Sequence, residues 1–529
     1  MKQIVIHELS LTLEENEGLL KEKAARKLGV SIGELEHIQI LRKSLDARKK
    51  DNIVYKYSVV TTLGDRMAVR ATERGLSTYK APETPKIEPG TEALKGKIVI
   101  VGAGPAGLLA AHTLATAGYQ PLLLEKGEPI EARKKAFQLL QEQGILNEKS
   151  NACFGEGGAG AFSDGKLTAR NKDPNAMQVL NLFVKHGAPK EITYLAKPHL
   201  GTEYIQRIVS SVRKEIEVLG GQVIFGATVI DFLAQHGQLT QIAYEKEGVT
   251  HQVDTNACIL ATGHSARKIY ELLEKKEVEM QAKAFAMGVR IEHARALIDT
   301  RQYGKHAGHP ALGAAEYVLK TQINGRGIYS FCMCPGGEVI CSATEEGHTA
   351  VNGMSYYRRE MPFSNSALVV TVGVQDFPAG GALAGMKLQR EIEHRAFLAA
   401  EGYGAITQRY QDFIQNKASK EAGVSSYKPY TKSGNFRNIL PAYIGDSLAA
   451  AGSAFDRKIY GFVQEGMLIG TETRTSSPVR ILRDETMQAS IRGLYPVGEG
   501  AGYAGGIMSS AIDGLRGAQA IIERFGLPK

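Results

Sequence analysis

The chain has 529 residues with a formal charge of +8, from 64 basic and 56 acidic residues, and 58 of its residues are glycine. At a glycine share of about 7%, roughly 37 glycines would be expected, so the excess is about 21. Hydrophobic content of 43% and charged content of 23% exclude a disordered, fibrous or coiled-coil protein, and the length predicts two or three domains.

Cysteine usage and hydropathy predict a cytoplasmic protein. The five cysteines are an odd number and do not resemble a secretory disulfide framework. No stretch approaches the roughly 18 apolar residues that a membrane span needs. Residues 1–10 also lack the apolar core and the cleavage site of a signal peptide, so we expect neither export nor a membrane span.

Residues 1–90 predict a small ferredoxin-like α/β domain of βαββ order, which ends in a linker. The linker lies in residues 81–90, which contain three prolines. A basic stretch at 42–50 separates the last two predicted strands; we expect a solvated connection there, and an RNA or acidic-partner surface is the alternative. The predicted elements are strands over 3–13, 37–41 and 53–62 and a helix over 15–28.

A dinucleotide-binding fingerprint begins after the linker. A strand of four β-branched residues, 98–101, leads into a turn with Gly102, Gly104 and Gly107 and then into a helix over 108–117. The three glycines provide a tight turn, close backbone approach to a pyrophosphate, and close packing of the helix on the strand. The helix N-terminus then faces the phosphates with its partial positive charge.

A second strand, over 121–124, completes this unit. It ends in Glu125, 18 residues after Gly107, and the Glu125 carboxylate can accept hydrogen bonds from ribose hydroxyls. We therefore expect a nucleotide with a free 2′-hydroxyl and no 2′-phosphate.

The rest of the chain predicts alternating helices and strands. Residues 283–480 alternate without repeats and predict an inserted domain, and residues 494–525 return to a strand, a glycine-rich turn and a long helix. Before the insertion we expect a helix over 203–219 and strands over 223–232, 239–246, 250–253 and 257–260.

Three segments together resemble the two-dinucleotide-binding-motif flavoproteins of the glutathione-reductase-like superfamily. They are residues 101–107 with Glu125 and Lys126, residues 261–263, and residues 495–517, which read YPVGEGAGYAGGIMSSAIDGLRG. The resemblance implies FAD as the cofactor, with Gly498 and Glu499 on its ribityl and pyrophosphate part. It also implies that the following helix, from near Met508, aims its N-terminus at the flavin. Backbone donors there would stabilise the negative charge of a reduced flavin and raise its reduction potential.

More closely, the whole chain resembles uncharacterised FAD-dependent dehydrogenases that precede the flavin domain with a small α/β domain. The resembling motifs are FGEGGAGAFSDGKL, ILATGHSAR, FCMCPGG and TRTSSPVR. This resemblance implies a cofactor and a reaction class but no substrate. The expected fold is α/β, with a discontinuous Rossmann-like FAD-binding domain over 96–282 and 481–529 and an inserted mixed α/β substrate domain over 283–480.

The residues expected to bind FAD come from all of these segments. They are Gly102, Gly104, Pro105, Ala106, Gly107, Glu125, Lys126, Arg133, Gly158, Ser163, Val229, Thr262, Gly263, Gly498, Glu499, Gly506 and Met508. We expect no metal site.

The loop over 154–170 predicts further contacts. It has five glycines between positions 155 and 165, so its backbone can approach a planar ligand closely. In the resemblance it takes the place of the loop beside the isoalloxazine ring, with Ser163, Asp164 and Lys166 as polar contacts. Asp164 and Lys166 are therefore candidate catalytic residues, and a solvated turn is the alternative.

Two closely spaced cysteines are the other candidate catalytic residues. Cys332 and Cys334 lie in the motif FCMCPGG, with Cys341 downstream. One interpretation is a redox-active or nucleophilic thiol near the flavin, which needs a lowered pKa. A second is a metal or iron–sulfur site, although the spacing matches no common pattern. A third is small buried hydrophobic residues before a turn.

These observations predict an FAD-dependent oxidoreductase that exchanges a hydride between flavin N5 and a small organic substrate. No second glycine fingerprint appears between residues 200 and 480, so NAD(P)H, if it is the electron donor, would bind transiently. The alternatives are an FAD-dependent RNA-modifying enzyme, although we expect no nucleic-acid partner, and a non-catalytic flavin redox sensor. Anionic-substrate contacts or structural residues are expected at Arg290, His293, Arg295 and Arg474.

Overall fold

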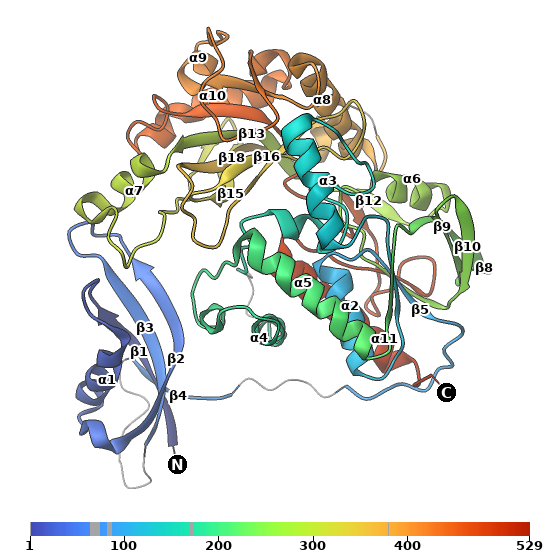
Figure 1. Ribbon diagram of the computed structural model, residues 1–529, viewed down its shortest axis with the longest axis horizontal. Coiled ribbons are helices and arrows are strands. Elements are labelled where there is room, and N and C mark those ends of the chain that lie inside the picture. Colours follow the sequence, from blue (N-terminus) through green and yellow to red (C-terminus); the bar gives the residue numbers. More distant parts are fainter. Residues whose placement is uncertain (1, 64–74, 82–86, 169–172, 379, 529) are drawn as a thin grey trace.

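The computed structural model describes residues 2–63, 75–81, 87–168, 173–378 and 380–528. The fold is mixed α/β, with both parallel and antiparallel sheets (Figure 1). Two of the linker prolines, Pro82 and Pro85, lie outside the described residues, as do residues 169 and 170 of the predicted glycine-rich loop. Within the described part of the chain, no helix combines the length and the apolar character that a membrane crossing requires.

The N-terminal part forms a four-stranded antiparallel sheet in the order β2-β3-β1-β4. Its elements are β1 (Lys2–Leu11), α1 (Leu20–Leu28), β2 (Leu35–Asp46), β3 (Val54–Leu63) and β4 (Leu76–Thr78). Helix α1 buries Leu20 and Ala24 in the core that it shares with the sheet, and it ends at Gly29 in the left-handed conformation. The strand, helix, strand, strand order follows the predicted one, and β4 adds a fourth strand.

Strand β2 is longer than the sequence pattern predicts, because it includes the first half of the basic stretch. It is an edge strand, so its charged side chains stay in water while its backbone pairs with β3. Lys43 pairs with Glu17 at 2.7 Å and lies 4.9 Å from the centre of the Tyr55 ring. Arg48 pairs with Asp46. Two of the positive charges in this stretch are thus neutralised within the same sheet and its connections.

Five parallel strands form a second sheet in the order β23-β11-β5-β6-β7. Their bounds are β5 (Ile98–Val101), β6 (Leu122–Glu125), β7 (Gln222–Phe225), β11 (Ala257–Leu260) and β23 (Leu494–Pro496). Strand β23 comes from the C-terminal part of the chain and pairs with β11. All residues of β5, β6, β11 and β23 are buried, which explains why these strands are apolar except for Glu125 at the end of β6.

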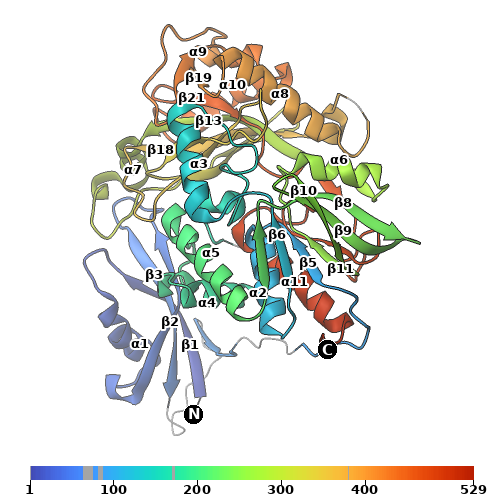
Figure 2. The same cartoon turned by 45° about the vertical axis from the view of Figure 1, so that its right-hand side comes forward.

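Alternate residues of the parallel sheet pack on opposite faces. Ile98, Ile100 and Ile259 share a core with helices α2, α5 and α11, of which α2 packs against both others (Figures 1 and 2). Val99 and Cys258 share a second core with a three-stranded antiparallel sheet. These elements are α2 (Pro105–Thr116), α5 (Gly201–Val218), α11 (Ile507–Arg524), β8 (Thr228–Gln235), β9 (Gln238–Lys246) and β10 (Val249–Asp254).

A third sheet has seven strands in the order β14-β15-β18-β13-β21-β19-β20. Strands β19 and β20 pair in parallel, and the other neighbours pair antiparallel. The strands are β13 (Phe285–Ala294), β14 (Lys320–Ile323), β15 (Arg326–Cys334), β18 (Phe363–Val372), β19 (Ala405–Arg409), β20 (Thr431–Ser433) and β21 (Met467–Glu472). The accompanying helices are α7 (Arg295–Tyr303), α8 (Ala384–Ala400), α9 (Tyr410–Ile414) and α10 (Ala442–Asp456).

Short pairs of strands connect these sheets. Strands β12 and β22 pair antiparallel at the two points where the chain passes from the parallel sheet to the seven-stranded sheet and back. The N-terminal hairpin also reaches the seven-stranded part, where the Tyr55 hydroxyl donates to the Ala311 carbonyl at 2.7 Å. The remaining α-helices and strands are α3 (Ile130–Gln143), α4 (Ala176–Lys185), α6 (Arg267–Lys275), β12 (Met280–Ala282), β16 (Glu338–Cys341), β17 (Val351–Met354) and β22 (Val479–Ile481).

Candidate functional site

Three glycine-bearing turns meet at the carboxyl edge of the parallel sheet. They follow β5, β11 and β23, which are neighbours in the sheet. A Cβ on Gly102 would lie 2.6 Å from the Ala261 carbonyl oxygen, and one on Gly500 would lie 2.8 Å from the Gly263 backbone. The structure thus brings the three motif segments of the sequence together at the edge where open parallel sheets bind their ligands.

The glycines of the first turn differ in what surrounds them. A Cβ on Gly107 would lie 1.8 Å from the Gly102 carbonyl oxygen, so the packing of α2 on β5 requires this glycine. At Gly104 the atom nearest to a Cβ would be the Gly158 Cα at 3.9 Å, so the protein itself leaves room there. Gly104 is the N-cap of α2, and Pro105 starts the helix where a missing N–H costs no hydrogen bond. This open position at the positive end of a helix fits a pyrophosphate.

Helix α11 brings a second N-terminus to the same edge. It starts at Ile507, one residue before the predicted start, after Gly506 with a φ of 136°, where a Cβ would meet no described atom within 4 Å. A Cβ on Gly514 would lie 2.0 Å from the Ala106 carbonyl oxygen, so α11 and α2 touch backbone to backbone. The Met508 side chain is 2% exposed and packs in the core, so only its backbone N–H could face a ligand.

An acidic residue of α11 fixes the turn after β23. The Asp513 carboxylate accepts a hydrogen bond from the Gly498 N–H at 2.7 Å and two from Arg483 at 2.8 and 2.9 Å. Glu499 lies in the same turn, with 3.4 Å between its Oε1 and the Nδ1 of His264. The Glu499 side chain is 25% exposed, so its carboxylate can still meet a ligand.

The Glu125 side chain holds three backbone segments together through hydrogen bonds. Its buried carboxylate accepts hydrogen bonds from the N–H groups of Ala103 at 2.8 Å, Gly127 at 2.8 Å and Gly155 at 3.0 Å. A carboxylate has about four lone-pair sites, so one remains for a ribose hydroxyl. The residue therefore both joins three loops and keeps the acceptor that the sequence predicts.

Other predicted cofactor residues surround this edge in different ways. A Cβ on Gly263, whose φ is 71°, would meet no described atom within 4 Å, and Thr262 beside it is half-buried. The Lys126 ammonium lies 3.5 Å from the centre of the Phe154 ring, and burial lowers the pKa of Lys126 to about 8. The Val229 side chain packs in the core, so this residue could offer a ligand only its backbone.

Arg133 supports the glycine-rich loop and has no donor left for a cofactor. It is fully buried, and its five N–H groups donate to carbonyls in the loop and directly before it, at distances of 2.6 to 3.3 Å. Contrary to the sequence-based prediction, Arg133 therefore has no free N–H group with which to contact the cofactor directly. The carbonyl acceptors are those of Asn151, Ala152, Gly155, Glu156 and Gly158.

The glycine-rich loop crosses the front of both helix N-termini. A Cβ on Gly158 would lie 3.1 Å from the Gly104 Cα, and one on Gly160 would lie 3.0 Å from the Ile507 side chain. The Ser163 hydroxyl donates to the Gly160 carbonyl at 2.8 Å, so it is engaged within the loop itself. The loop therefore closes the cradle, and its glycines permit the close approach.

Asp164 is buried and ionised, which excludes the solvated turn. The Arg359 Nε donates to its carboxylate at 2.9 Å, the Lys166 ammonium lies at 2.8 Å, and the Ser355 hydroxyl donates to it. Burial alone would raise the pKa of Asp164, but Lys166 and Arg359 outweigh it and hold that pKa well below its usual range. The Lys166 side chain is 30% exposed and also donates to the Met333 carbonyl, so it joins this cluster to the thiols.

The two thiols occupy a strained bulge, which we term the thiol loop, residues 332–334. The pairing of β15 with β18 shifts by one residue here, and Cys332 has a φ of 42°, a conformation that side chains rarely adopt. The buried Arg290 holds the loop, donating to the Cys332 carbonyl at 2.6 Å. A hydrogen bond from Cys334, with Lys166 and Arg290 nearby, lowers the pKa of Cys332 below that of an ordinary thiol although burial opposes it. The pKa of Cys334 is raised well above its usual value.

Three of the four residues considered for an anionic substrate are structural. Arg290 is fully buried and pairs with Glu472 at 2.6 Å. His293 is buried, and burial lowers its pKa to about 4. Arg474 pairs with a buried glutamate, as described below. Arg295 has a side chain that is 35% exposed, and it alone among the four keeps substantial contact with solvent.

The sequence matches a known relative along its whole length. A protein of Clostridium beijerinckii, described as uncharacterized, is 43% identical over 535 residues, covering 99% of this chain and 100% of that protein. Residues 96–300 match the family described as pyridine nucleotide-disulphide oxidoreductase, and residues 284–475 match "FAD-dependent protein, C-terminal domain-like". The chain belongs to an uncharacterised family of FAD-dependent oxidoreductases. Residues 1–61 match a domain of unknown function.

Two of the solved structures that resemble this flavoprotein do so only distantly. The flavin-dependent brominase Bmp2, as a triple mutant, has a TM-score of 0.38 and 13% identity, over 81% of this chain and 80% of that chain. The E. coli quinol fumarate reductase FrdA has a TM-score of 0.36 and 13% identity, over 82% of this chain and 70% of that chain. At this level of similarity, neither structure bears on the substrate of this flavoprotein.

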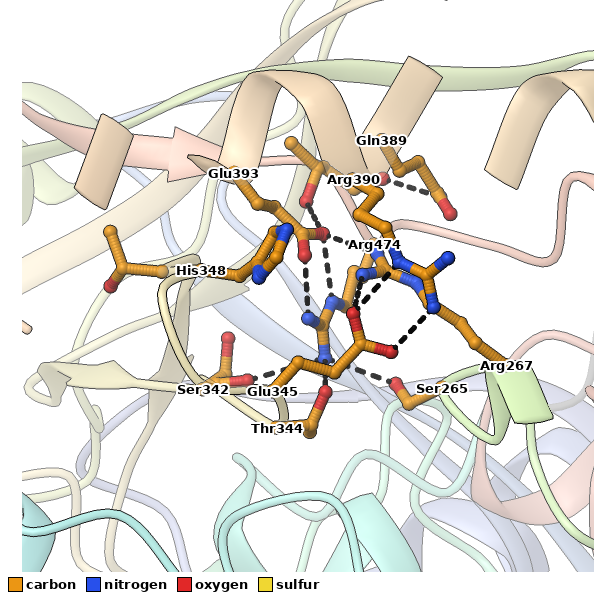
Figure 3. A network of polar contacts seen from close by, with 12 residues as sticks. Ser265, Arg267, Ser342, Thr344, Glu345, His348, Gln389, Arg390, Glu393 and Arg474 are labelled. Carbon is orange, nitrogen blue, oxygen red and sulfur yellow. Dashed lines mark hydrogen bonds and ion pairs between the residues drawn. The ribbon is translucent and has the colours of Figure 1, made fainter. Parts of the chain in front are cut away.

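A buried ion network joins two of the family motifs (Figure 3). Glu393 of α8 is fully buried and accepts from Arg267 of ILATGHSAR at 2.8 Å and from Arg474 of TRTSSPVR at 2.7 and 2.9 Å. Glu345 continues the network by binding Arg267 and Arg390, each at 3.0 Å. Two motifs that are about 200 residues apart are therefore held together by one carboxylate.

Several residues of this site carried no recognisable signal in the sequence. Arg359 holds Asp164, Asp513 holds Gly498, and Glu393 holds two arginines. Each partner lies at least 15 residues away along the chain, and charged residues at such distances form no motif. His264 lies inside ILATGHSAR, so the motif contained it without indicating that it would face Glu499.

Proposed function

We propose that the flavoprotein exchanges a hydride between bound FAD and a small organic substrate. The observation that supports this most is the meeting of three open glycine turns and two helix N-termini, of α2 and α11, at one sheet edge. Gly104 and Gly506 leave free space at those N-termini, as a bound pyrophosphate and flavin require. FAD supplies the two-electron redox chemistry when it is bound.

The cofactor contacts follow from this arrangement. Gly102, Gly104 and Gly107 would shape the pyrophosphate turn, Glu125 would accept from the ribose, and Glu499 would meet the ribityl part. Thr262, Gly263, Gly498 and Gly506 would line the same edge by backbone, and Lys126 would stand beside it with a lowered pKa. Arg133, Gly158 and Ser163 would act through the loop rather than through donors of their own.

We place the substrate between this edge and the seven-stranded sheet. The expected domains are 1–90, ferredoxin-like; 96–282 and 481–529, FAD-binding; and 283–480, substrate-binding. The pairing of β12 with β22 at both crossing points supports these boundaries. The free thiols are compatible with a cytoplasmic location.

The catalytic groups would be Lys166, Cys332 and Cys334, with the predicted catalytic residue Asp164 positioning them. Lys166 connects the end of the glycine-rich loop to the thiol loop through the Met333 carbonyl, so these groups form one unit. Cys332, as a thiolate beside Lys166, could take up a proton or attack an electrophilic carbon of the substrate. Asp164 would act as a positioning residue, because its carboxylate is held by three partners and has a depressed pKa.

The function is tested by anaerobic flavin reduction. The purified yellow protein is mixed with NADH, NADPH and a panel of hydroxy, amino and carbonyl metabolites, and flavin absorbance is followed. Rapid bleaching by one of them, with catalytic turnover when an acceptor is added, supports the proposal. A flavin that no compound reduces would instead favour the redox sensor. The RNA-modifying alternative would need retention of tRNA, which the partly neutralised basic stretch does not favour.

Alkylation should distinguish the two thiols. At pH 7 we expect iodoacetamide to modify Cys332 before Cys334, because Cys332 is half-buried with a lowered pKa and Cys334 is buried with a raised pKa. The alkylation rate at Cys332 should rise with pH and level off at a midpoint below that of an ordinary thiol. In Lys166→Met this midpoint should move to higher pH, since a nearby cation stabilises the thiolate. Peptide mass mapping measures both, with the half-buried Cys153 as the internal reference. A Cys332 midpoint near the ordinary value of about 8.5 would contradict this assignment.

A further inference from the structure

Two histidines and a glutamate from three helical segments converge on one point. His112 lies in α2, His186 directly follows α4, and Glu215 lies in α5. One potential ligand atom of each residue lies within 4.8 Å of the other two. His112 is about two helical turns after Pro105, roughly 10 Å along α2 from the end that faces the cofactor edge. The cluster is therefore separate from the flavin site.

The facing atoms of this cluster approach each other without hydrogen bonding. The Glu215 Oε2 is 2.6 Å from the His186 Nε2 and 3.4 Å from the His112 Nε2. All three atoms are shielded from solvent, and none has a hydrogen-bond partner of suitable geometry among the described residues. The Glu215 Oε2 lies within ion-pair distance of both ring nitrogens, but no hydrogen bond satisfies these three buried atoms. Buried polar atoms without hydrogen bonds are costly, so this arrangement needs an explanation. A shared cation would satisfy all three.

Neighbouring residues orient the His186 ring and shield it from solvent. The His186 Nδ1 lies 2.8 Å from the Ser211 hydroxyl, which orients the ring and leaves Nε2 for the cluster. The His186 side chain is 6% exposed, and that of Glu215, at the rim, is 21% exposed.

We propose that His112, His186 and Glu215 bind one divalent transition-metal ion of the zinc class. Two imidazole nitrogens and one carboxylate oxygen suit such an ion, whereas Mg²⁺ and Ca²⁺ prefer oxygen ligands alone. Water at the exposed rim beside Glu215 would complete the coordination. Since the cluster is far from the cofactor edge, the ion ties α2, α4 and α5 together and takes no part in redox chemistry.

Lys185, at the rim of the cluster, would compete with a metal ion for the Glu215 carboxylate. The Lys185 ammonium contacts the other carboxylate oxygen of Glu215, and its side chain is 61% exposed. Its positive charge opposes a cation bound to the same carboxylate. Removal of this charge should therefore tighten metal binding, an effect that a purely structural cluster of histidines and glutamate would not show.

The test is a zinc titration of the FAD-bound protein. After treatment with a chelator, the protein is titrated with ZnCl₂ against a chromophoric chelator. We expect one tightly bound Zn²⁺ per chain, with nitrogen and oxygen ligands at about 2.0–2.1 Å by X-ray absorption. His186→Gln and Glu215→Gln should each lose this ion, and His37→Gln, which changes an exposed histidine of β2, should keep it.

The variant Lys185→Met makes the proposal falsifiable even if the ligand variants fold poorly. Tighter zinc binding in Lys185→Met supports the site, and unchanged or weaker binding overturns it. Absence of stoichiometric zinc in the wild-type protein overturns it as well. So does zinc that persists in both His186→Gln and Glu215→Gln.

Discussion

Gly104→Val is expected to yield a folded protein without bound FAD. The Gly104 backbone has φ of −74° and ψ of −177°, which valine adopts without strain. A Cβ there would be 3.9 Å from the nearest protein atom, so the added side chain enters the space proposed for the pyrophosphate instead of the protein core. Overpacking of this kind costs about 1–3 kcal/mol, which corresponds to FAD binding about 5- to 160-fold weaker.

The matched control is Gly107→Val in the same turn. A Cβ at Gly107 would lie 1.8 Å from the Gly102 carbonyl oxygen, so this variant should unfold the turn itself. Flavin absorbance after gel filtration and circular dichroism separate the two cases. Gly104→Val should lose the flavin absorbance and keep the circular dichroism spectrum of the folded protein, whereas Gly107→Val should lose both. A yellow Gly104→Val protein with unchanged FAD affinity would place the pyrophosphate elsewhere.

Glu393→Gln should destabilise the protein more than any surface substitution on the same helix. Glu393 is fully buried between Arg267 and Arg474, and the amide would leave two guanidinium groups without their counter-charge (Figure 3). Breaking a buried ion pair by removing one partner costs about 3–5 kcal/mol. Calorimetry should show a markedly lower temperature for the unfolding transition that contains α8.

A matched control for Glu393 lies two residues earlier on α8. Glu391 pairs with Arg395, and both side chains are about half exposed, so Glu391→Gln should change stability by no more than about 0.5 kcal/mol. Equal melting temperatures for the two variants would contradict the role of the buried network.

The stabilisation by Glu393 should also depend on pH in a defined direction. Burial alone would raise the pKa of Glu393, but Arg267 and Arg474 outweigh it and hold that pKa well below its usual range. A carboxylate whose pKa is depressed in the folded state stabilises that state fully at pH values above the pKa of the unfolded-state carboxylate, about 4.3. The difference in the free energy of unfolding between wild type and Glu393→Gln should therefore be at its full size at pH 7 and decrease only in acid.

The sequence predicted those parts of the site that local patterns encode. The strand before Gly102, the helix after Gly104 and the acid at Glu125 follow from spacing alone, because each depends on neighbours within about 25 residues. The burial of Met508 and Val229 is also visible in their apolar character, although we expected contact with the cofactor there. The turns at the glycines could be predicted from the sequence, because a residue without a side chain is favoured where the backbone turns tightly or is approached closely.

Side-chain partners across the fold were not predictable in this way. Arg133 looked like a cofactor ligand, but its guanidinium is used up by carbonyls of a loop whose path depends on tertiary packing. The sequence left Arg474 open as a substrate contact or a structural residue, and only its position next to Glu393 favours the structural role. Likewise, His112, His186 and Glu215 form no motif, because they meet only when three separate helical segments pack.

Strand β23 imposes an order on the maturation of this protein. As the chain is synthesised, β5, β6, β7 and β11 emerge well before β23 and α11, which begin at residues 494 and 507. Until these last segments pair with β11 and pack on α2, the proposed cradle lacks one wall and one of its helix N-termini. We therefore expect FAD to be loaded only after β23 and α11 have emerged, and a nascent chain halted before residue 494 should be colourless however well its earlier sheets had folded.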